Sequence, residues 1–203
     1  MSYLYIYLYC LDYPCLIGSS VPISRHIHDT SNIPFEEHNL DMPWLGMQLD
    51  YTYIEPILEI LNSTEQPLLS RQEAHITVIS PPEYRILSTS TNITIDELNH
   101  LAKSHKIQSS IFSVVCLGKV IQKENNFDHV VYQLIISSPS LIKLRESIFR
   151  LFYIRKGNPS LFDPHAFWPH ITIGFTDHDL FVEQGIYKGL NACYRPITYL
   201  DSK

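Results

Sequence analysis

The chain has 203 residues, of which 45% are hydrophobic and 18% are charged, and its formal net charge at pH 7 is −6. This composition indicates a globular protein with a substantial core and argues against a disordered chain. The negative charge argues against a broad, non-specific binder of nucleic acids, because such proteins gain affinity by neutralising many phosphates with Lys and Arg. The negative charge does not argue against a nucleic-acid substrate that is bound only at one terminal phosphate.

The N-terminal part of the chain differs in composition from the rest. Residues 3–11 alternate Tyr with Leu or Ile and predict a short strand, whereas residues 18–43 carry Pro, Ser, Asp and His and predict a loop. The opening segment lacks the basic residues of a signal peptide and is too short and interrupted for a membrane span. We therefore expect residues 1–43 to form an N-terminal extension and residues 44–203 to form one domain.

The first part of that domain predicts two strands with a helix between them. Residues 45–51 (LGMQLDY) predict a strand, and residues 52–62 predict a helix because their apolar residues recur at helical spacing. A second strand is expected at about residues 74–80, where Pro81-Pro82 ends it.

The middle of the chain predicts a helix and a hairpin. The sequence Thr94-Ile95-Asp96-Glu97 matches a capping box, so a helix is expected over about residues 95–104. Residues 111–121 carry apolar side chains at alternate positions and predict a strand, and residues 127–137 predict its antiparallel partner across a loop at residues 122–126.

The last part of the chain predicts two helices and two strands. Ser138-Pro139 is a strong helix start, and the residues after it have one apolar face. A strand is expected at about residues 168–175. Asp177 is a candidate cap for a short helix that ends near residue 184, and a last strand is expected near residues 193–200.

The cysteines are Cys10, Cys15, Cys116 and Cys193. They are too few and too scattered to predict a disulfide framework, and no C-x-x-C metal pair occurs. We expect reduced thiols and, with them, a cytoplasmic or nuclear protein. Secretion stays open as the alternative, because Asn62-Ser63-Thr64 and Asn92-Ile93-Thr94 match the glycosylation sequon, which also occurs freely in cytosolic chains.

Two of the expected strands carry the same short motif. His75-Ile76-Thr77-Val78 recurs as His170-Ile171-Thr172-Ile173, 95 residues further along the chain. Residues two apart on a strand share a face, so each motif projects an imidazole and a hydroxyl together, with Cα atoms roughly 7 Å apart. Two such strands side by side place two imidazoles and two hydroxyls around one anionic group, which suits proton transfer on a phosphate ester.

The repeated motif has to be weighed against chance. The chain has ten histidines, so one accidental match to His-apolar-Ser/Thr-apolar is expected in about one chain in four. Two accidental matches are expected in only about one chain in a few tens. Both matches also lie in segments that independently predict strands, which favours a shared function over two unrelated strand histidines.

The order of the expected elements predicts an α+β fold with an internal repeat. A motif strand and a helix are followed by further antiparallel strands and a helix, and then by the second motif strand and a helix. We therefore expect two pseudo-symmetric antiparallel-sheet lobes flanked by helices. That the motif strands meet at a central cleft is inferred from the repeated motif alone.

The paired motifs resemble those of the 2H phosphoesterase superfamily, which is named for two His-apolar-Ser/Thr-apolar motifs about one lobe apart. The resemblance covers about residues 44–200, and the paired motifs are its specific part. It implies a bilobal α+β fold and a phosphodiesterase that works without metal or other cofactor. The substrates it implies are RNA ends, 2′,3′-cyclic phosphates, 2′,5′-linked oligoadenylates and ADP-ribose 1″,2″-cyclic phosphate.

The resemblance also assigns roles to the four motif side chains. His75 and His170 become the general acid and the general base, which requires one neutral and one protonated imidazole. Thr77 and Thr172 hydrogen-bond the phosphate oxygens. Which histidine is the acid stays open, as do the natural substrate, the bond that is cleaved and the oligomeric state. The expected partner is an RNA end or a small nucleotide, with neither a membrane nor a metal.

Residues beside the motifs are further candidates. Phe167 and Trp168 could stack on a nucleobase, with a structural role in the core as the alternative. Arg71, before the first motif, and Arg155 with Lys156, before the second, could attract a phosphate. The alternative for each of these cations is an exposed charge that aids solubility.

Three other functions compete with this interpretation. A metal hydrolase could draw ligands from His26-Ile27-His28-Asp29 and His38, but the H-x-H-x-H motif of nucleotide hydrolases fails at Thr30. A catalytically silent RNA- or nucleotide-binding module of the same fold would predict a degraded motif, and all four motif positions are intact. A serine or cysteine hydrolase lacks both the G-x-S-x-G elbow and a recognisable cysteine signature.

Overall fold

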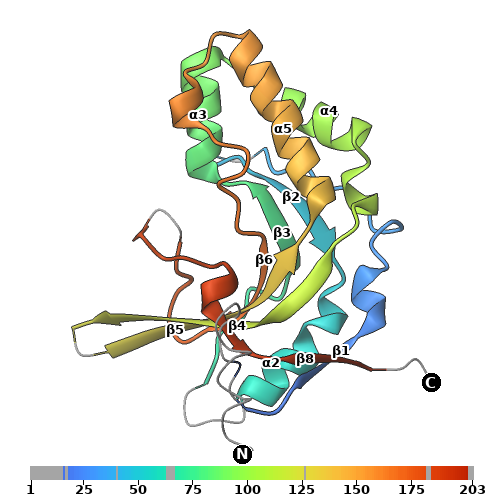
Figure 1. Ribbon diagram of the computed structural model, residues 1–203, viewed down its shortest axis with the longest axis vertical. Helices are drawn as coiled ribbons and strands as arrows, with labels where there is room; N and C mark the ends of the chain where they lie inside the picture. The colour runs from blue at the N-terminus through green and yellow to red at the C-terminus, as the bar shows by residue number, and fades with distance from the viewer. Residues whose placement is uncertain are drawn as a thin grey trace, which may run out of the picture.

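The computed structural model describes residues 16, 18–39, 41–62, 67–125, 127–181 and 184–200. Its strands are β1 (Val21–Ser24), β2 (Leu45–Leu49), β3 (Ala74–Ile79), β4 (Ser113–Glu124), β5 (Phe127–Ser137), β6 (His170–Phe175), β7 (Cys193–Arg195) and β8 (Ile197–Leu200). Its α-helices are α2 (Glu55–Asn62), α3 (Pro81–Thr91), α4 (Ile95–Ser104) and α5 (Pro139–Ile154). The fold of this described part is therefore mixed α+β, as the sequence predicts (Figure 1).

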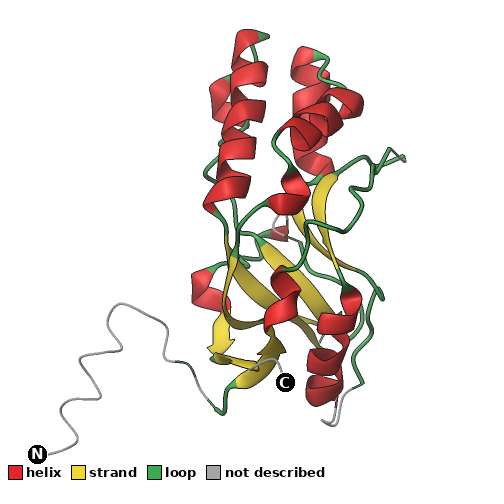
Figure 2. Ribbon diagram, turned by 90° about the vertical axis from the view of Figure 1, so that its right-hand side faces the viewer, coloured by secondary structure: helices red, strands yellow, loops and turns green. Residues whose placement is uncertain are grey.

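The strands of the described part form three small sheets. The largest has the order β6-β5-β4-β7 and is antiparallel throughout, β2 and β3 form a second antiparallel pair, and β1 pairs with β8 in parallel. The two motif strands, β3 and β6, belong to different sheets but lie next to each other. Helices α3, α4 and α5 gather at one end of the strands, while α2 lies at the other (Figures 1 and 2).

The two motif strands alternate as expected. On β3, Ile76 and Val78 are 0% and 1% exposed, and on β6 Ile171 is 0% exposed, so these side chains enter the main hydrophobic core. The His and Thr side chains between them are half-buried on the opposite face. The core therefore fixes which face of each strand carries the polar groups.

Most of the expected helices form, and one unexpected helix joins them. The capping box that starts at Thr94 is present, and Ser138 caps α5 as predicted. Pro81-Pro82 ends β3 but also begins α3, where Ser80 and Glu83 form a second capping box. Proline suits the first turn of a helix because its missing N–H is not needed there. From the sequence, these prolines predict only the end of the strand.

Two expectations about secondary structure are wrong. Residues 18–43, expected as loop, contain β1, whose pairing with β8 is parallel and links opposite ends of the chain. A four-residue strand with so distant a partner leaves no local hairpin signal. The helix expected from Asp177 to about residue 184 is absent from the described residues 177–181, which are irregular. The Asp177 side chain instead contacts His178 and His129.

The remaining differences are shifts of element ends. The expected helix at residues 52–62 starts at Glu55, after a 3₁₀ turn. The hairpin strand β4 extends to Glu124, so the loop is shorter than the predicted residues 122–126. The last strand is divided into β7 and β8 around Pro196. The strand expected at residues 3–11 lies outside the described residues.

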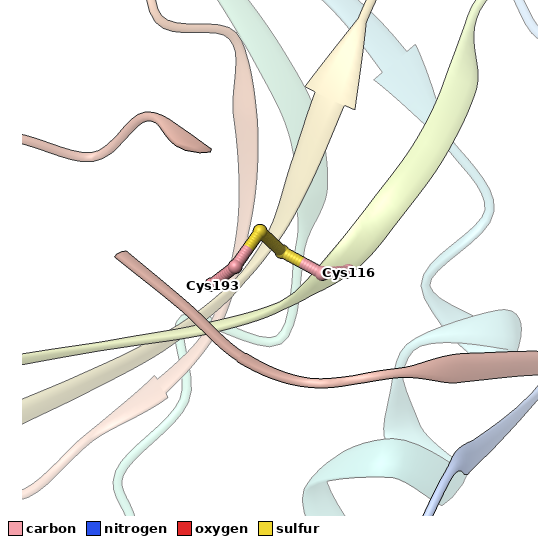
Figure 3. The surroundings of a disulfide bond; sticks show 2 residues. All are labelled: Cys116 and Cys193. Atoms are coloured by element: carbon pink, nitrogen blue, oxygen red, sulfur yellow. A yellow bond between two sulfur atoms is a disulfide. The ribbon is translucent and has the colours of Figure 1, made fainter. Parts of the chain in front are cut away.

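Cys116 and Cys193 form a disulfide, so the expectation of reduced thiols is wrong for this pair (Figure 3). The antiparallel pairing of β4 with β7 brings their Cα atoms to 5.7 Å, although 77 residues separate them in the chain. Such bonds persist mainly in oxidising compartments. The cysteines therefore no longer support a cytoplasmic or nuclear location. Within the described part of the chain, every helix falls short of the length and apolar character that a membrane span needs.

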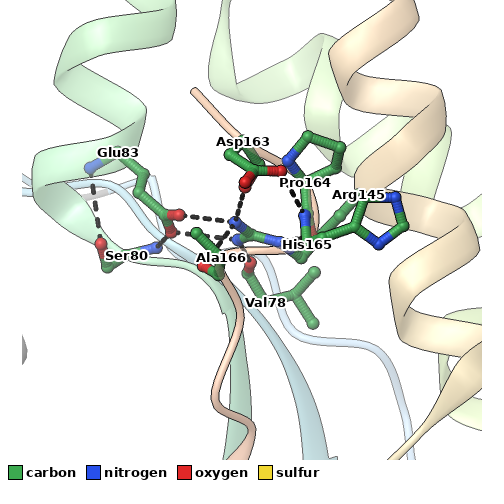
Figure 4. Close-up of polar contacts among 8 residues, drawn as sticks. All are labelled: Val78, Ser80, Glu83, Arg145, Asp163, Pro164, His165 and Ala166. Carbon is green, nitrogen blue, oxygen red and sulfur yellow. Dashed lines mark hydrogen bonds and ion pairs between the residues drawn. The ribbon is translucent and has the colours of Figure 1, made fainter. Parts of the chain in front are cut away.

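Arg145 on α5 is the largest fully buried side chain of the described core, and it joins three segments of the chain (Figure 4). Its guanidinium pairs with Glu83 of α3 at 2.8 Å and donates to the Val78 carbonyl at 2.6 Å. It also donates to backbone carbonyls before β6, those of Asp163, Pro164 and Ala166. This arginine thereby fixes the end of β3 relative to the segment that leads into β6.

We predict that Arg145→Lys lowers the free energy of unfolding by about 3–5 kcal/mol, because an ammonium cannot replace a forked, five-donor group in a buried site. The matched control is Arg150→Lys, on an exposed position of the same helix. It should change the free energy of unfolding by less than about 0.5 kcal/mol. Chemical denaturation followed by circular dichroism makes the comparison, and equal effects of both substitutions would contradict the role given to Arg145.

Candidate active site

A pocket lies where the two motif strands meet. Its lining residues are Arg71, Glu73, His75, Thr172 and Asp179. His75 comes from β3 and Thr172 from β6, while Arg71 and Glu73 lead into β3 and Asp179 follows β6. The structure thus brings one motif side chain from each strand to the same pocket, together with charged groups of both signs.

His170 stands at the start of β6 beside this pocket and has a defined orientation. Its Nδ1 atom lies 2.9 Å from the carbonyl oxygen of Trp168, so in the neutral imidazole the Nδ1–H donates to that carbonyl. Nε2 then carries the lone pair. The ammonium of Lys188 lies 3.5 Å from this Nε2 atom. The ring is therefore held with its basic nitrogen beside a positive charge.

The carboxylate of Asp179 connects the polar groups of the pocket. It lies 3.2 Å from the Arg71 guanidinium and 2.8 Å from the Lys188 ammonium, and it accepts a hydrogen bond from the Thr172 hydroxyl at 3.4 Å. Asp179 is 7% exposed and Lys188 is 1% exposed. Guanidinium, ammonium and hydroxyl groups are the donors that proteins use for phosphate. In the free protein they converge on one carboxylate.

His75 is held on its other side by aromatic rings. The Trp44 ring centroid lies 4.5 Å from that of His75, and His38 stacks on Trp44 with ring centroids 3.7 Å apart. Gly46 makes room for the indole, because a Cβ atom there would lie 2.4 Å from a Trp44 ring carbon. His75 Nδ1 lies 3.7 Å from the Glu73 carboxylate and has no hydrogen-bond partner among the described residues.

Both motif imidazoles are neutral at neutral pH in the free protein. Burial lowers the pKa of His75 to about 4, and the positive charge of Arg71 acts in the same direction. Burial likewise lowers the pKa of His170 to about 4, with the charge of Lys188 as the second cause. Desolvation disfavours the imidazolium, and a nearby cation does the same. An anion in the pocket would act in the opposite direction on both rings.

Of the other candidate residues from the sequence, some lie at the pocket and others do not. Thr77 shares the half-buried face of β3 with His75 but is not one of the residues that line the pocket, whereas Arg71 is. Trp168 precedes His170 and meets the Tyr187 ring edge-on at 5.2 Å. The guanidinium of Arg145 lies 4.7 Å from the centre of the Phe167 ring, so one face of this ring is already covered.

Arg155 and Lys156 are the remaining candidates for phosphate attraction. Arg155 lies at the C-terminal end of α5 and pairs with Glu97 at the start of α4. Its charge therefore serves helix packing at the helical end of the molecule.

Sequence reasoning missed Asp179, Lys188, Glu73 and the contact of Trp44 with His75. Asp179 lies in the segment that we expected to be helical, and Lys188 lies in a loop without a motif. Their importance depends on contacts between distant segments, which hydrophobic periodicity does not report. A signal was present only for Glu73, which precedes the first motif by two residues and therefore lies on the same side of the extended chain.

The residues proposed for a metal hydrolase do not converge on one point. His26 pairs with Asp29 at 2.6 Å, His28 with the Tyr199 hydroxyl at 3.0 Å, and His38 with the Gln48 amide at 2.7 Å. Among the described residues, the cluster of ligand-type side chains near enough to share an ion is instead His129, Asp177 and His178. The N-terminal histidines thus give the metal hypothesis no site.

Comparison with known families gives one clear result. The model of a family described as the Swiss Army Knife 2H phosphoesterase domain matches residues 43–181. The matched segment covers more than half of the chain and contains both motif strands and every residue that lines the pocket. Lys188 lies beyond it. No curated protein and no solved structure was found to match the chain.

The lowered pKa values of His75 and His170 predict that acid destabilises the protein. Both fall from the ordinary value of 6.5 to about 4, so between these pH values the unfolded chain binds more protons than the folded chain. The stability contributed by the two neutral imidazoles is fully present above pH 6.5 and is lost as the pH falls toward 4. We expect the melting temperature of the wild type to decrease as the pH is lowered from 6.5 to about 4.

The control is the double variant His75→Asn/His170→Asn, whose melting temperature should fall less over the same pH range. Burial also lowers the pKa values of His28 and His38, but both remain in each protein and cancel from the comparison. Scanning calorimetry at several pH values measures the two slopes. If the melting temperatures of the wild type and the double variant changed equally with pH, the pKa values of His75 and His170 would not be lowered by folding.

Proposed function

Since the chain belongs to the Swiss Army Knife group of 2H phosphoesterases, we propose that it is a metal-independent phosphodiesterase. It hydrolyses a cyclic or 2′-linked ribose phosphate, at an RNA end or in a small nucleotide, with His75 and His170 as the acid–base pair. Family membership by itself indicates activity on phosphoesters. The observation that supports the finer proposal is the convergence of the His75 imidazole, the Thr172 hydroxyl and the Arg71 guanidinium on one pocket.

The proposal includes the bilobal arrangement that the family implies, with residues 44–203 as the catalytic domain and residues 1–43 as an extension. One lobe contains β3 and the other contains β6, and the substrate phosphate lies between them. Thr172 donates to one phosphate oxygen, and Thr77 reaches another once a substrate fills the space above β3. Trp168 is the better candidate for base stacking, because Arg145 already covers Phe167.

The two histidines take different roles in this mechanism. His170 is the general base, because its Nδ1–H is committed to the Trp168 carbonyl and Nε2 is the atom that can take a proton. The Lys188 ammonium, 3.5 Å from Nε2 in the free protein, has to leave this contact when the water is bound. His170 removes a proton from water as the water oxygen attacks phosphorus. The ester P–O bond then breaks, and His75 donates a proton to the leaving ribose oxygen. The Glu73 carboxylate, 3.7 Å from His75 Nδ1, favours the imidazolium that this step requires.

The pocket holds donors that suit a phosphodiester anion. Arg71 and Lys188 contribute two positive charges, and the carboxylates of Asp179 and Glu73 contribute two negative ones. A bound phosphate therefore gains from direct hydrogen bonds to the guanidinium and the ammonium, in place of their contacts with Asp179, and not from a net positive charge. The same anion raises the pKa of the nearby imidazoles, so one of them can hold a proton at neutral pH only when substrate is bound.

The main alternative is a catalytically silent module that binds RNA ends or nucleotides with the same fold. Such a module is expected to have lost at least one motif residue. In this chain both motif histidines and both motif threonines are present. Turnover measurements separate the two functions directly.

The first test is hydrolysis of a substrate panel in the presence of EDTA. The panel comprises 2′,3′-cyclic nucleotides, a cyclic-phosphate-ended RNA, 2′,5′-oligoadenylate and ADP-ribose 1″,2″-cyclic phosphate. We expect turnover of at least one member, and a loss of roughly 10²- to 10⁴-fold in rate for His75→Ala and for His170→Ala. His100→Ala, an exposed position on α4, is the matched control and should keep the wild-type rate. Absence of turnover by the folded wild type would favour the binding module.

A second test separates acid from base. A diester with a good leaving group, such as bis(p-nitrophenyl) phosphate, does not need a proton on the leaving oxygen. His75→Ala should therefore lose much less activity on this diester than on the ribose substrate, whereas His170→Ala should lose about as much on both. The reverse pattern would exchange the two roles, and equal losses for both variants on both substrates would contradict an acid–base division.

A further inference from the structure

Gln133 on β5 is a buried polar side chain whose amide is unpaired. It is 0% exposed, and neither Nε2 nor Oε1 has a hydrogen-bond partner among the residues that the structure describes. A buried amide without partners costs stability, because each atom has lost its hydrogen bonds to water. In native proteins such a group has a catalytic or binding role, or it contacts an ordered water or ion.

The position of Gln133 places it beside the candidate active site. It is directly opposite Thr172 in the pairing of β5 with β6, so the two side chains lie on the same face of the sheet. The Cβ atoms of such a pair are about 5 Å apart. On its other side Gln133 faces Gly118 of β4, which has no side chain to cover it. Gln133 is therefore the β5 neighbour of a residue that lines the pocket, although it does not itself line it.

A second buried glutamine shows what a structural amide looks like in this protein. Gln108 accepts a hydrogen bond from the Gln48 backbone N–H at 2.9 Å and donates to the Gln48 carbonyl at 3.1 Å. Both ends of its amide are thus paired within the chain. Gln133 has similar burial but neither of these contacts, so the two residues make a matched pair for experiment.

The two unpaired atoms define the ligand that would satisfy them. Nε2 requires an acceptor and Oε1 requires a donor. An ionised phosphate offers acceptors only, so a phosphate alone leaves Oε1 unpaired. A ribose hydroxyl next to a phosphate supplies the donor, and the phosphate or the same hydroxyl supplies the acceptor. Deoxyribose lacks that hydroxyl.

We propose that Gln133 is a specificity-determining residue, which recognises a free ribose hydroxyl adjacent to the phosphate held at Thr172. The inference rests on the proposed function and narrows its substrates to those with a free hydroxyl beside the phosphate, such as 2′,5′-oligoadenylate or ADP-ribose 1″,2″-cyclic phosphate. In a 2′,3′-cyclic phosphate both hydroxyls are esterified, so there Gln133 would recognise only the product. The amide is covered in the free protein, so the neighbouring side chains shift when the ribose enters. The free protein carries the cost of the unpaired amide, and the bound ligand relieves it.

The first measurement uses the free protein and needs no substrate. Gln133→Met keeps the length and volume of the side chain but removes both polar atoms, so the variant should melt a few degrees higher than the wild type. Gln108→Met is the matched control and should melt lower, because it leaves backbone groups of Gln48 unpaired. A fall in melting temperature for Gln133→Met like that of the control would overturn the proposal.

The second measurement compares ribose phosphates that differ by one hydroxyl. Isothermal titration uses adenosine 2′-phosphate against its 3′-deoxy analogue, and adenosine 3′-phosphate against its 2′-deoxy analogue. In at least one pair the wild type should bind the hydroxyl-bearing member about tenfold or more tightly, and Gln133→Met should bind both members equally. Inorganic phosphate should bind both proteins alike.

The outcomes distinguish this inference from the proposed function. If the wild type binds both members of each pair equally, or binds neither, the role of Gln133 is refuted whatever the turnover panel shows. If the wild type hydrolyses a panel substrate but has no hydroxyl preference, the phosphodiesterase stands and the inference fails. If Gln133→Met is stabilised and the hydroxyl preference is lost with it, the inference holds even for a protein that binds without turnover.

Discussion

The carboxylate of Asp179 is the interaction on which the candidate site depends. It joins Arg71 before β3, Thr172 on β6 and Lys188 in the C-terminal loop, which are three segments distant in the sequence. Without it, the guanidinium and the ammonium would repel each other in a partly buried space, and unpaired buried charges are costly. The carboxylate thus lets two cations stay beside two neutral imidazoles. In the free protein, a carboxylate of the chain already occupies the position between the two cations.

This arrangement links electrostatics to chemistry. Burial and neighbouring cations keep His75 and His170 neutral in the free protein, whereas acid–base catalysis needs one proton between them. A phosphodiester brings the negative charge that restores this proton, so the substrate itself completes the catalytic state. The backbone carbonyl of Trp168 orients one ring, and the Trp44 ring holds the other in place. Orientation is therefore supplied by the fold and protonation by the ligand.

The sequence predicts those features of this protein that depend on neighbours along the chain. The alternation of both motif strands and the helix that starts after Thr94 need only adjacent residues, and the structure contains both. Contacts between distant segments were missed. The Cys116 to Cys193 disulfide spans 77 residues, and Lys188 reaches the site from a loop without a motif. In the same way, no local pattern reports that β1 pairs with β8.

The central claim is that both motif histidines face a single anion. Titration of the protein with inorganic phosphate in EDTA, followed by NMR of the histidine ring protons, tests it most directly. If both rings face one anion, the His75 and His170 signals shift together with one dissociation constant, and the pKa of at least one ring rises when phosphate is bound. Shifts of one ring alone, or of neither, would show that the two motifs do not share a site.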